Sequence, residues 1–232
     1  MGEQAAADLQ RTGCNAKYVN LDISDSDSIQ RFAETLQRDY EKLDVLINNA
    51  GIAFKAADPT SFADQAAPTV GTNFFGTLHL TLALLPLLRN SGSARVVNVS
   101  SEAGHLRIIK APSLKAQFIS EDLSLQMLEG LMHKFVTDVQ NGSHAEEGWP
   151  NTCYGMSKLA VTAATRVLAN TYPDIIFASC CPGYCDTDMT SHRGTKTSEE
   201  GARTPFFLAT TEELPVAEMT GRFFSQEREI EF

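Results

Sequence analysis

Apolar residues follow two patterns along the chain, and the two patterns alternate. In some stretches they recur three or four residues apart, the spacing of a helix with one buried face. Elsewhere they form short continuous runs that end in polar residues or glycine, as in strands buried on both faces. The predicted helices cover 2–13, 25–43, 62–89, 120–142, 151–172 and a stretch that opens with a capping sequence at 197–200. The predicted strands cover 16–23, 43–51, 94–101, 174–183 and 221–225. This alternation predicts an α/β fold, with a parallel sheet covered by helices on both faces.

Polar residues and glycine stand where four of these predicted strands end. Asp22 lies at the end of the first, 48–51 (Asn-Asn-Ala-Gly) at the end of the second, Ser100 and Ser101 at the end of the third, and 181–183 (Cys-Pro-Gly) at the end of the fourth. In parallel sheets, ligands bind beyond the carboxyl ends of the strands. The pattern therefore predicts a site at one edge of the sheet.

Composition narrows the class of protein. The 232 residues are 43% hydrophobic and carry a net charge of −10, enough chain for one domain with a full core. The acidic balance argues against nucleic acid or an anionic membrane as a partner. There is no unbroken run of about 18 apolar residues, as a membrane span would need, and no signal-peptide pattern at the start. The five cysteines lack metal-ligand spacing and indicate reduced thiols in the cytoplasm: Cys14, Cys153, Cys180, Cys181 and Cys185.

Tyr154 and Lys158 are the first candidates for chemistry. They stand four residues apart in a predicted helix and so share one face. A nearby ammonium favours the phenolate and lowers the pKa of a tyrosine, which then serves as a general acid or base. Ser101 ends a strand at the same edge, where its hydroxyl would orient a carbonyl group. Taken alone, the pair is more often two ordinary helix residues than a catalytic unit.

Five motifs in this order decide between these interpretations. NNAG (48–51), TNFFGT (72–77), VVNVSS (96–101), YGMSK (154–158) and CCPG (180–183) together resemble the short-chain dehydrogenase/reductase family. Ser101 and Tyr154 are separated by 53 positions, a long interval that resembles the monomeric NADPH-dependent carbonyl reductase branch. The resemblance covers nearly the whole chain. It implies a single domain over 1–232 with a Rossmann-like, doubly wound sheet. A helical insertion at about 112–150 would cover the surface that other members use to oligomerise, which implies a monomer.

The resemblance also implies a role for each matching residue. Tyr154 donates a proton to the substrate carbonyl, and Ser101 hydrogen-bonds that carbonyl. Lys158 lowers the pKa of Tyr154 and binds the nicotinamide ribose, and Asn73 steadies a water in the proton relay. Further NADPH contacts are implied for Asp22 and Ile23 near the adenine, for Asn49, and for Cys185, Asp186 and Thr187 at the carboxamide or phosphate end. The substrate side would be lined by Phe54, Lys55 and Tyr184. Asp186 stands where the branch usually has a basic residue.

One part of the family pattern has no counterpart here. Family members begin with a strand, a glycine-rich turn that receives the pyrophosphate, a helix and a second strand. The sequence holds no such turn, and the strand at 43–51 is expected to have an unpaired edge.

Three functions are therefore weighed. The first is reduction of ketones, aldehydes or quinones with NADPH. The second is a truncated, inactive form that binds cofactor poorly. The third is a module that binds carbonyl compounds without reducing them.

Overall fold

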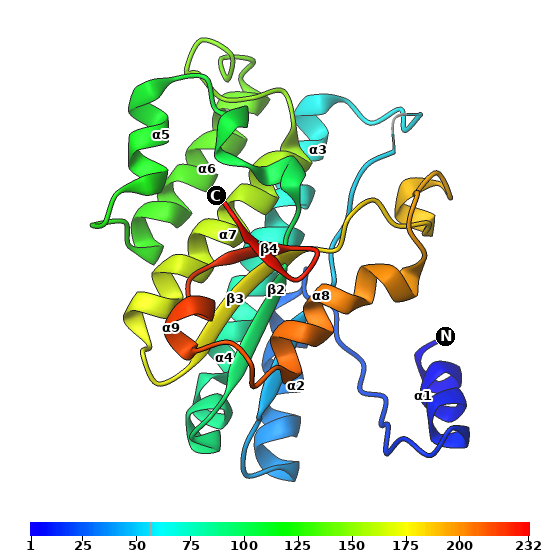
Figure 1. The fold of residues 1–232 in the computed structure, drawn as a ribbon. Helices are drawn as coiled ribbons and strands as arrows, with labels where there is room; N and C mark the ends of the chain where they lie inside the picture. The colour runs from blue at the N-terminus through cyan, green and yellow to red at the C-terminus, as the bar shows by residue number, and fades with distance from the viewer. Residues whose placement is uncertain (56) are drawn as a thin grey trace.

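The computed structural model describes residues 1–55 and 57–232. Its centre is one five-stranded sheet in the order β1-β2-β3-β4-β5 (Figure 1). The strands are β1 (Val45–Asn48), β2 (Arg95–Val99), β3 (Ile176–Cys181), β4 (Phe223–Ser225) and β5 (Arg228–Ile230). The first four run parallel, and β5 turns back antiparallel on β4. The predicted α/β fold with a parallel sheet is thus confirmed, and β5 is an addition that the sequence pattern did not predict.

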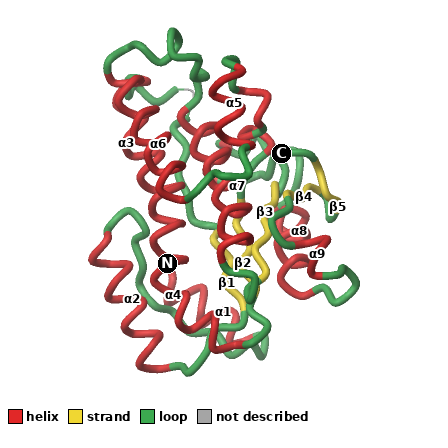
Figure 2. The backbone as a smooth tube through the Cα atoms, turned by 90° about the vertical axis from the view of Figure 1, so that its left-hand side faces the viewer, coloured by secondary structure: helices red, strands yellow, loops and turns green. Residues whose placement is uncertain are grey.

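Helices cover both faces of this sheet. In chain order, the helices of the described residues are α1 (Gly2–Arg11), α2 (Ser26–Asp39), α3 (Phe62–Val70), α4 (Thr77–Ser91), α5 (Pro112–Ile119), α6 (Leu125–Gln140), α7 (Cys153–Thr171), α8 (Ser198–Thr210) and α9 (Val216–Met219), and all but α1 pack on the body of the fold. In Figure 2 the strands lie between α4 and α7 on one side and α8 and α9 on the other. The capping box predicted at Thr197 and Glu200 is present at the start of α8.

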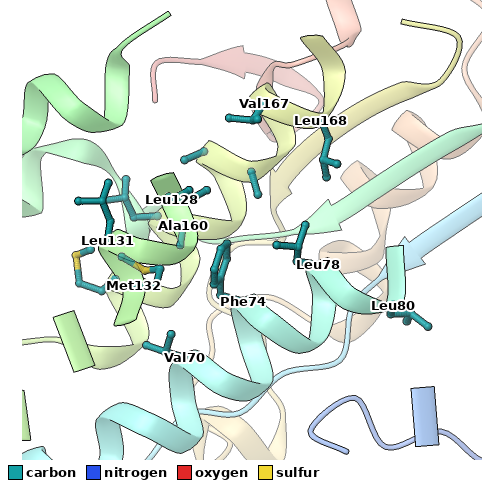
Figure 3. Packing of buried hydrophobic residues seen from close by; sticks show 14 of the residues in the cluster. Val70, Phe74, Leu78, Leu80, Leu128, Leu131, Met132, Ala160, Val167 and Leu168 are labelled. Atoms are coloured by element: carbon teal, nitrogen blue, oxygen red, sulfur yellow. The ribbon is translucent and has the colours of Figure 1, made fainter. Parts of the chain in front are cut away.

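Alternate side chains of the strands enter two separate cores. Val96 and Phe177 belong to the larger core, and Val97 and Ala178 belong to the smaller core under α8. Successive strand residues point to opposite faces, so a strand between two helical layers carries apolar side chains on both of its faces. Figure 3 shows the larger core where Phe74 and Leu78 face the α7 helix. This explains why these strands appear in the sequence as continuous apolar runs.

The 112–150 segment is helical and contains α5 and α6, while its status as an insertion relative to the family stays a prediction. Leu128, Met132 and Phe135 of α6 are fully buried, and α6 packs on α3 and α7. The side chain of Asp138 accepts from the indole N–H of Trp149 over 2.8 Å and from the ammonium of Lys134 over 2.8 Å. These bonds join α6 to the loop that follows it, while the apolar face of α6 holds the segment against the core.

The long helix predicted at 62–89 forms, but with an interruption. Between α3 and α4 the backbone takes a π-helical turn, η1 (Gly71–Gly76), which carries Asn73. Single π turns often occur at functional sites. The continuous stretch Phe62–Ser91 is long and apolar enough to cross a membrane by length and composition, although half of its most apolar window is buried in the fold. The core helix of a globular protein meets the same criteria.

The prediction of a strand at 16–23 is wrong. In the described structure these residues form an extended loop outside the sheet. A strand needs a neighbour for its backbone groups, and no strand of the described sheet pairs with this segment; a groove of about 580 Å³ lies between part of the loop and the residues of α2 and 40–43. Val19, Leu21 and Leu43 are among the residues that line the groove. The helix α1 buries none of its side chains and stands away from the sheet (Figure 1).

The edge of β1 is open, as the sequence predicts. Val45 is 37% exposed and Ile47 44% exposed, although both belong to a strand of a parallel sheet. Leu46 points the other way and packs against the larger core. In the described sheet β1 is an edge strand, and β2 is its only hydrogen-bonded neighbour there.

Candidate active site

Tyr154 and Lys158 lie on the first two turns of α7. Thr152 caps this helix, since its side chain accepts a hydrogen bond from the Gly155 N–H over 2.9 Å. The helix packs against β2 and β3 and places both residues beside the ends of these strands. The ammonium nitrogen of Lys158 lies 5.8 Å from the centre of the Tyr154 ring. The predicted pair is therefore one unit in space and not two separate surface residues.

Lys158 is a buried cation with a fixed position. It is 5% exposed, and its Nζ donates to the carbonyl oxygen of Val99 at the end of β2 over 2.8 Å. Burial disfavours the charged form and lowers the pKa of Lys158 to about 8. An ammonium has three N–H donors, and this bond uses one of them.

The pKa of Tyr154 departs from its ordinary value in the opposite direction to the one expected. Burial raises it, and a hydrogen bond with Ser101 opposes that effect. The expectation that Lys158 lowers this pKa is thus not met in the protein without cofactor, where burial has the larger effect. A raised pKa keeps the phenol protonated at neutral pH, which suits a proton donor.

Ser101 is brought to Tyr154 by a short turn after β2. It caps the 3₁₀ turn η2 (Glu102–Gly104), accepting the Ala103 N–H over 3.1 Å. This turn lies directly on α7: a Cβ built on Gly104 would stand 2.5 Å from the backbone nitrogen of Leu159. A Cβ on Gly155 would likewise meet the carbonyl oxygen of Ala103 at 2.8 Å. Glycine at both positions permits the close approach that joins Ser101 to the tyrosine helix.

Asn73 links three parts of the site. Its side-chain oxygen accepts the Ile52 N–H over 2.7 Å, and its amide nitrogen donates to the Ile52 carbonyl over 2.9 Å. The same nitrogen donates to the Ser157 hydroxyl over 3.0 Å, and Ser157 in turn donates to the Tyr154 carbonyl over 2.8 Å. The loop after β1, the π turn and the tyrosine helix are thereby held together. The predicted role of Asn73 in steadying a water stays a prediction.

Two serines contribute to the site without having been predicted. Besides Ser157, Ser100 donates to the Lys158 carbonyl over 2.8 Å and lies 2.7 Å from the Thr162 hydroxyl. The sequence signal for Ser100 was its place in the Ser-Ser pair at a strand end, and for Ser157 its place beside Lys158. Neither position tells which way the hydroxyl points.

The surroundings of Lys158 fit the nicotinamide ribose of a dinucleotide. Its two remaining N–H donors match ribose hydroxyls, and the nearby backbone is that of a glycine. A Cβ on Gly51 would lie 3.6 Å from the Lys158 nitrogen and 3.0 Å from the Asn73 oxygen. The described residues hold no glycine-rich turn before β1 to receive the pyrophosphate. The fit therefore concerns the nicotinamide end of the cofactor.

The predicted adenine contacts lie at the loop before α2. Asp22 is exposed, and its carboxylate accepts from the Ser24 N–H over 2.9 Å and from the Ser24 hydroxyl over 2.7 Å; these bonds lower its pKa. Ile23 is buried, and its carbonyl would stand 2.2 Å from a Cβ on Gly76 of the π turn. Its side chain belongs to the larger core. Asn49 is exposed just after β1. The cofactor roles of all three stay predictions.

The loop after β3 holds the other predicted cofactor residues. The carboxylate of Asp186 lies 2.7 Å from the Nδ1 of His192. Hydrogen bonds with Asp186 and Asp188 raise the pKa of this histidine. Thr187 caps a short turn, and Cys185 is half-buried. On the expected substrate side, Lys55 and Tyr184 are exposed and Phe54 is half-buried. Their roles stay predictions.

Within 1–55 and 57–232, no three His, Cys, Asp or Glu side chains form a group that could hold a metal ion.

Comparisons with known proteins show which family the chain resembles. The profile of the short chain dehydrogenase family matches residues 1–116. Carbonyl reductase (NADPH) 1 of Homo sapiens is 44% identical over 98% of this chain and 83% of its own length. Carbonyl reductase (NADPH) 3 of Mus musculus is 43% identical over 90% of this chain and 77% of its own length.

Solved structures show the same fold. Salutaridine reductase from Papaver somniferum superimposes with a TM-score of 0.85 at 26% identity, covering 97% of this chain and 87% of that structure. An NADPH-bound carbonyl reductase from chicken fatty liver has a TM-score of 0.66 at 23% identity, covering 99% and 82% respectively. At that identity the second likeness concerns the fold alone.

Proposed function

The chain belongs to the short-chain dehydrogenase family, and on this premise we propose that it reduces small-molecule ketones, aldehydes or quinones, with NADPH as the hydride donor. The observation that carries the proposal is the meeting of Tyr154, Lys158 and Ser101 at the carboxyl ends of β2 and β3. Relatives 42–44% identical are named for carbonyl reduction with NADPH. These similarities favour the reductase over both the inactive form and the module that only binds carbonyl compounds.

The chemistry of the site follows from the positions of the side chains. NADPH, when bound, supplies the hydride to the carbonyl carbon. Ser101 donates a hydrogen bond to the carbonyl oxygen as negative charge develops there. Tyr154 transfers its phenolic proton to that oxygen, and the product is the alcohol. The raised pKa of Tyr154 keeps this proton in place until the oxygen becomes basic enough to take it.

Lys158 has two tasks in this proposal. Its free N–H donors hold the ribose, and its charge stabilises the phenolate that remains after proton transfer. The hydrogen bond to Val99 keeps the ammonium at one place beside the tyrosine ring. Asn73 and Ser157 act on the site indirectly, by holding the helix turn and the loop that face it.

Oxidation of NADPH in the presence of menadione tests the reaction. Tyr154→Phe is expected to abolish turnover, because the ring remains but the proton donor is lost. Tyr172→Phe is the matched control: it removes the hydroxyl of another half-buried tyrosine, which follows the last turn of α7. It is expected to leave turnover unchanged. Equal activity of the Tyr154→Phe variant and the parent chain would reject the mechanism.

Binding of NADPH is a separate measurement that distinguishes the inactive form. Nucleotide fluorescence is expected to change saturably on addition of the protein, and Lys158→Ala is expected to weaken this binding. A protein that folds but shows no saturable binding would support the truncated, inactive alternative.

We infer that the protein acts as a monomer in the cytoplasm on small carbonyl compounds. All five cysteines are free thiols, in keeping with a reducing compartment. Helix α6 covers α3 and α7, the surface through which a family member would otherwise pair with a second copy. Sedimentation velocity tests the monomer.

A further inference from the structure

The C-terminal strand reaches the turn that carries Ser101. The hydroxyl of Ser225, the last residue of β4, donates to the carboxylate of Glu102 over 2.7 Å. Glu102 directly follows Ser101 and opens the turn η2. Ser225 is paired with Cys181 across the parallel β3–β4 ladder, so it lies at the carboxyl edge of the sheet where the site is built. A contact between residues 123 positions apart thus ends one residue from Ser101.

The turn η2 is held on two sides. On one side Gly104 and Ala103 lie against the backbone of α7, close to Lys158 and Gly155. On the other side the Glu102 carboxylate takes the hydrogen bond from β4. Within the turn, the Ser101 hydroxyl accepts the Ala103 N–H, and the Ser101 carbonyl accepts the Gly104 N–H over 2.9 Å. A shift of η2 therefore moves the Ser101 hydroxyl with it.

Ser225 is well suited to anchor this turn. It is 8% exposed, so its hydroxyl needs a partner inside the protein, and a bond to an ionised carboxylate is stronger than one between neutral groups. The strand itself is fixed by its ladder to β3 and by the tight hairpin to β5. The carboxylate of Glu102 is thus held from a strand whose own position is set by its hydrogen-bonded neighbours.

We propose that Glu102 and Ser225 are positioning residues for carbonyl reduction, which set the Ser101 hydroxyl against the carbonyl oxygen through the turn η2. This inference rests on the proposed function. Neither residue touches the reacting atoms. Their contribution appears in kcat, because the Ser101 hydrogen bond strengthens as charge develops on the oxygen.

Five variants test the pair. Ser225→Ala and Glu102→Ala each remove the contact and are expected to lower kcat by roughly three- to thirtyfold, the range for a coupled hydrogen bond, with little change in KM. Combined, they are expected to lower kcat no more than the stronger single variant, because both break one bond. Ser225→Thr keeps the hydroxyl and Glu102→Gln keeps an acceptor oxygen, so each is expected to restore most of the lost kcat.

Glu229→Ala is the matched control. It breaks a contact in the same hairpin, between Arg222 and Glu229 at 3.2 Å, on exposed side chains. It is expected to leave kcat unchanged. The inference is overturned if Ser225→Ala keeps full kcat, if the two alanine losses multiply in the double variant, or if Glu229→Ala costs as much.

Hydrogen exchange in the protein without NADPH separates this inference from the proposed function. Amides of residues 103–105 are expected to exchange faster in Ser225→Ala than in the parent chain, while those of α6 keep their rates. Equal exchange at 103–105 would refute the anchor even in an active enzyme. An inactive parent chain with faster exchange in Ser225→Ala would instead reject the reductase and retain the anchor.

Discussion

The ammonium of Lys158 donates to the carbonyl oxygen of Val99 over 2.8 Å, which ties the tyrosine helix to the end of β2. This contact places a charge in the interior beside Tyr154 and leaves N–H donors free for a ligand. The same burial that fixes the charge also makes it costly, since it lowers the pKa of Lys158 to about 8. Two predictions follow from this conflict between function and stability.

The first prediction concerns how kcat/KM changes on the alkaline side of its pH profile. Lys158 is protonated below its pKa of about 8 in the free protein and neutral above it, whereas Tyr154 stays protonated because its pKa is raised. We therefore expect kcat/KM to fall as pH rises through about 8. In Lys158→Arg the guanidinium stays charged, so the limb should move to higher pH even if the overall rate is lower. An unmoved limb in that variant would assign it to another group.

The second concerns stability. The folded protein releases the Lys158 proton near pH 8 and the unfolded chain near 10.5, so the parent chain gains stability as pH rises between these values. At pH 7 the buried charge opposes folding by about 3 kcal/mol. Lys158→Met is thus expected to abolish turnover but raise the free energy of unfolding at pH 7. Urea unfolding at pH 7 and pH 10.5 should show that the difference in the free energy of unfolding between Lys158→Met and the parent chain is smaller at pH 10.5. The same difference at both pH values would contradict the prediction.

A third prediction compares two glycines. Gly104→Ala would bring a Cβ within 2.7 Å of the Lys158 carbonyl carbon, and we expect it to destabilise the protein by about 1–3 kcal/mol and reduce turnover. Gly130→Ala lies inside α6 with nothing within 4 Å of the new Cβ. It should instead stabilise the protein by about 0.5–1 kcal/mol. Thermal unfolding measures both, and equal effects would mean that η2 does not pack tightly on α7.

A fourth prediction concerns the open edge of β1. An exposed strand edge with apolar side chains pairs readily with other chains. Ile47→Lys is expected to reduce concentration-dependent light scattering, because a charge on the edge opposes strand pairing. Met127→Lys adds the same charge at another exposed apolar position, on α6, and should leave scattering unchanged. If both variants reduce scattering equally, net charge and not the edge is responsible.

The sequence allowed four of the five strands and the longer helices to be predicted, because their apolar residues follow a clear pattern. The short helices α5 and α9 were not predicted individually. The strand expected at 16–23 failed although its residues favour strands. Strand formation depends on a neighbouring strand, and no neighbour adjoins this segment in the described sheet. The hairpin strand β5 was missed because its exposed, charged residues lack the apolar run of a buried strand.

The catalytic candidates were likewise accessible in part. Tyr154, Lys158 and Ser101 were found from their motifs, and the structure places them in one site. The hydroxyls of Ser100, Ser157 and Ser225 were not assigned roles, because a serine at a strand end or in a helix can face either protein or solvent. The expected direction of the shift in the Tyr154 pKa was wrong, because a spacing of four residues does not show whether the side chain is buried.

The sequence by itself determined the fold class, the family, the helix that carries the tyrosine and lysine, and the edge of the sheet that holds the site. These depend on local periodicity and on motif order, which are properties of neighbouring residues. Only the tertiary structure decided that the 16–23 segment stays outside the sheet, that Lys158 is buried against Val99, and that Ser225 holds the turn of Ser101. These depend on contacts between residues far apart along the chain, where burial and close packing set pKa values and hydrogen-bond partners.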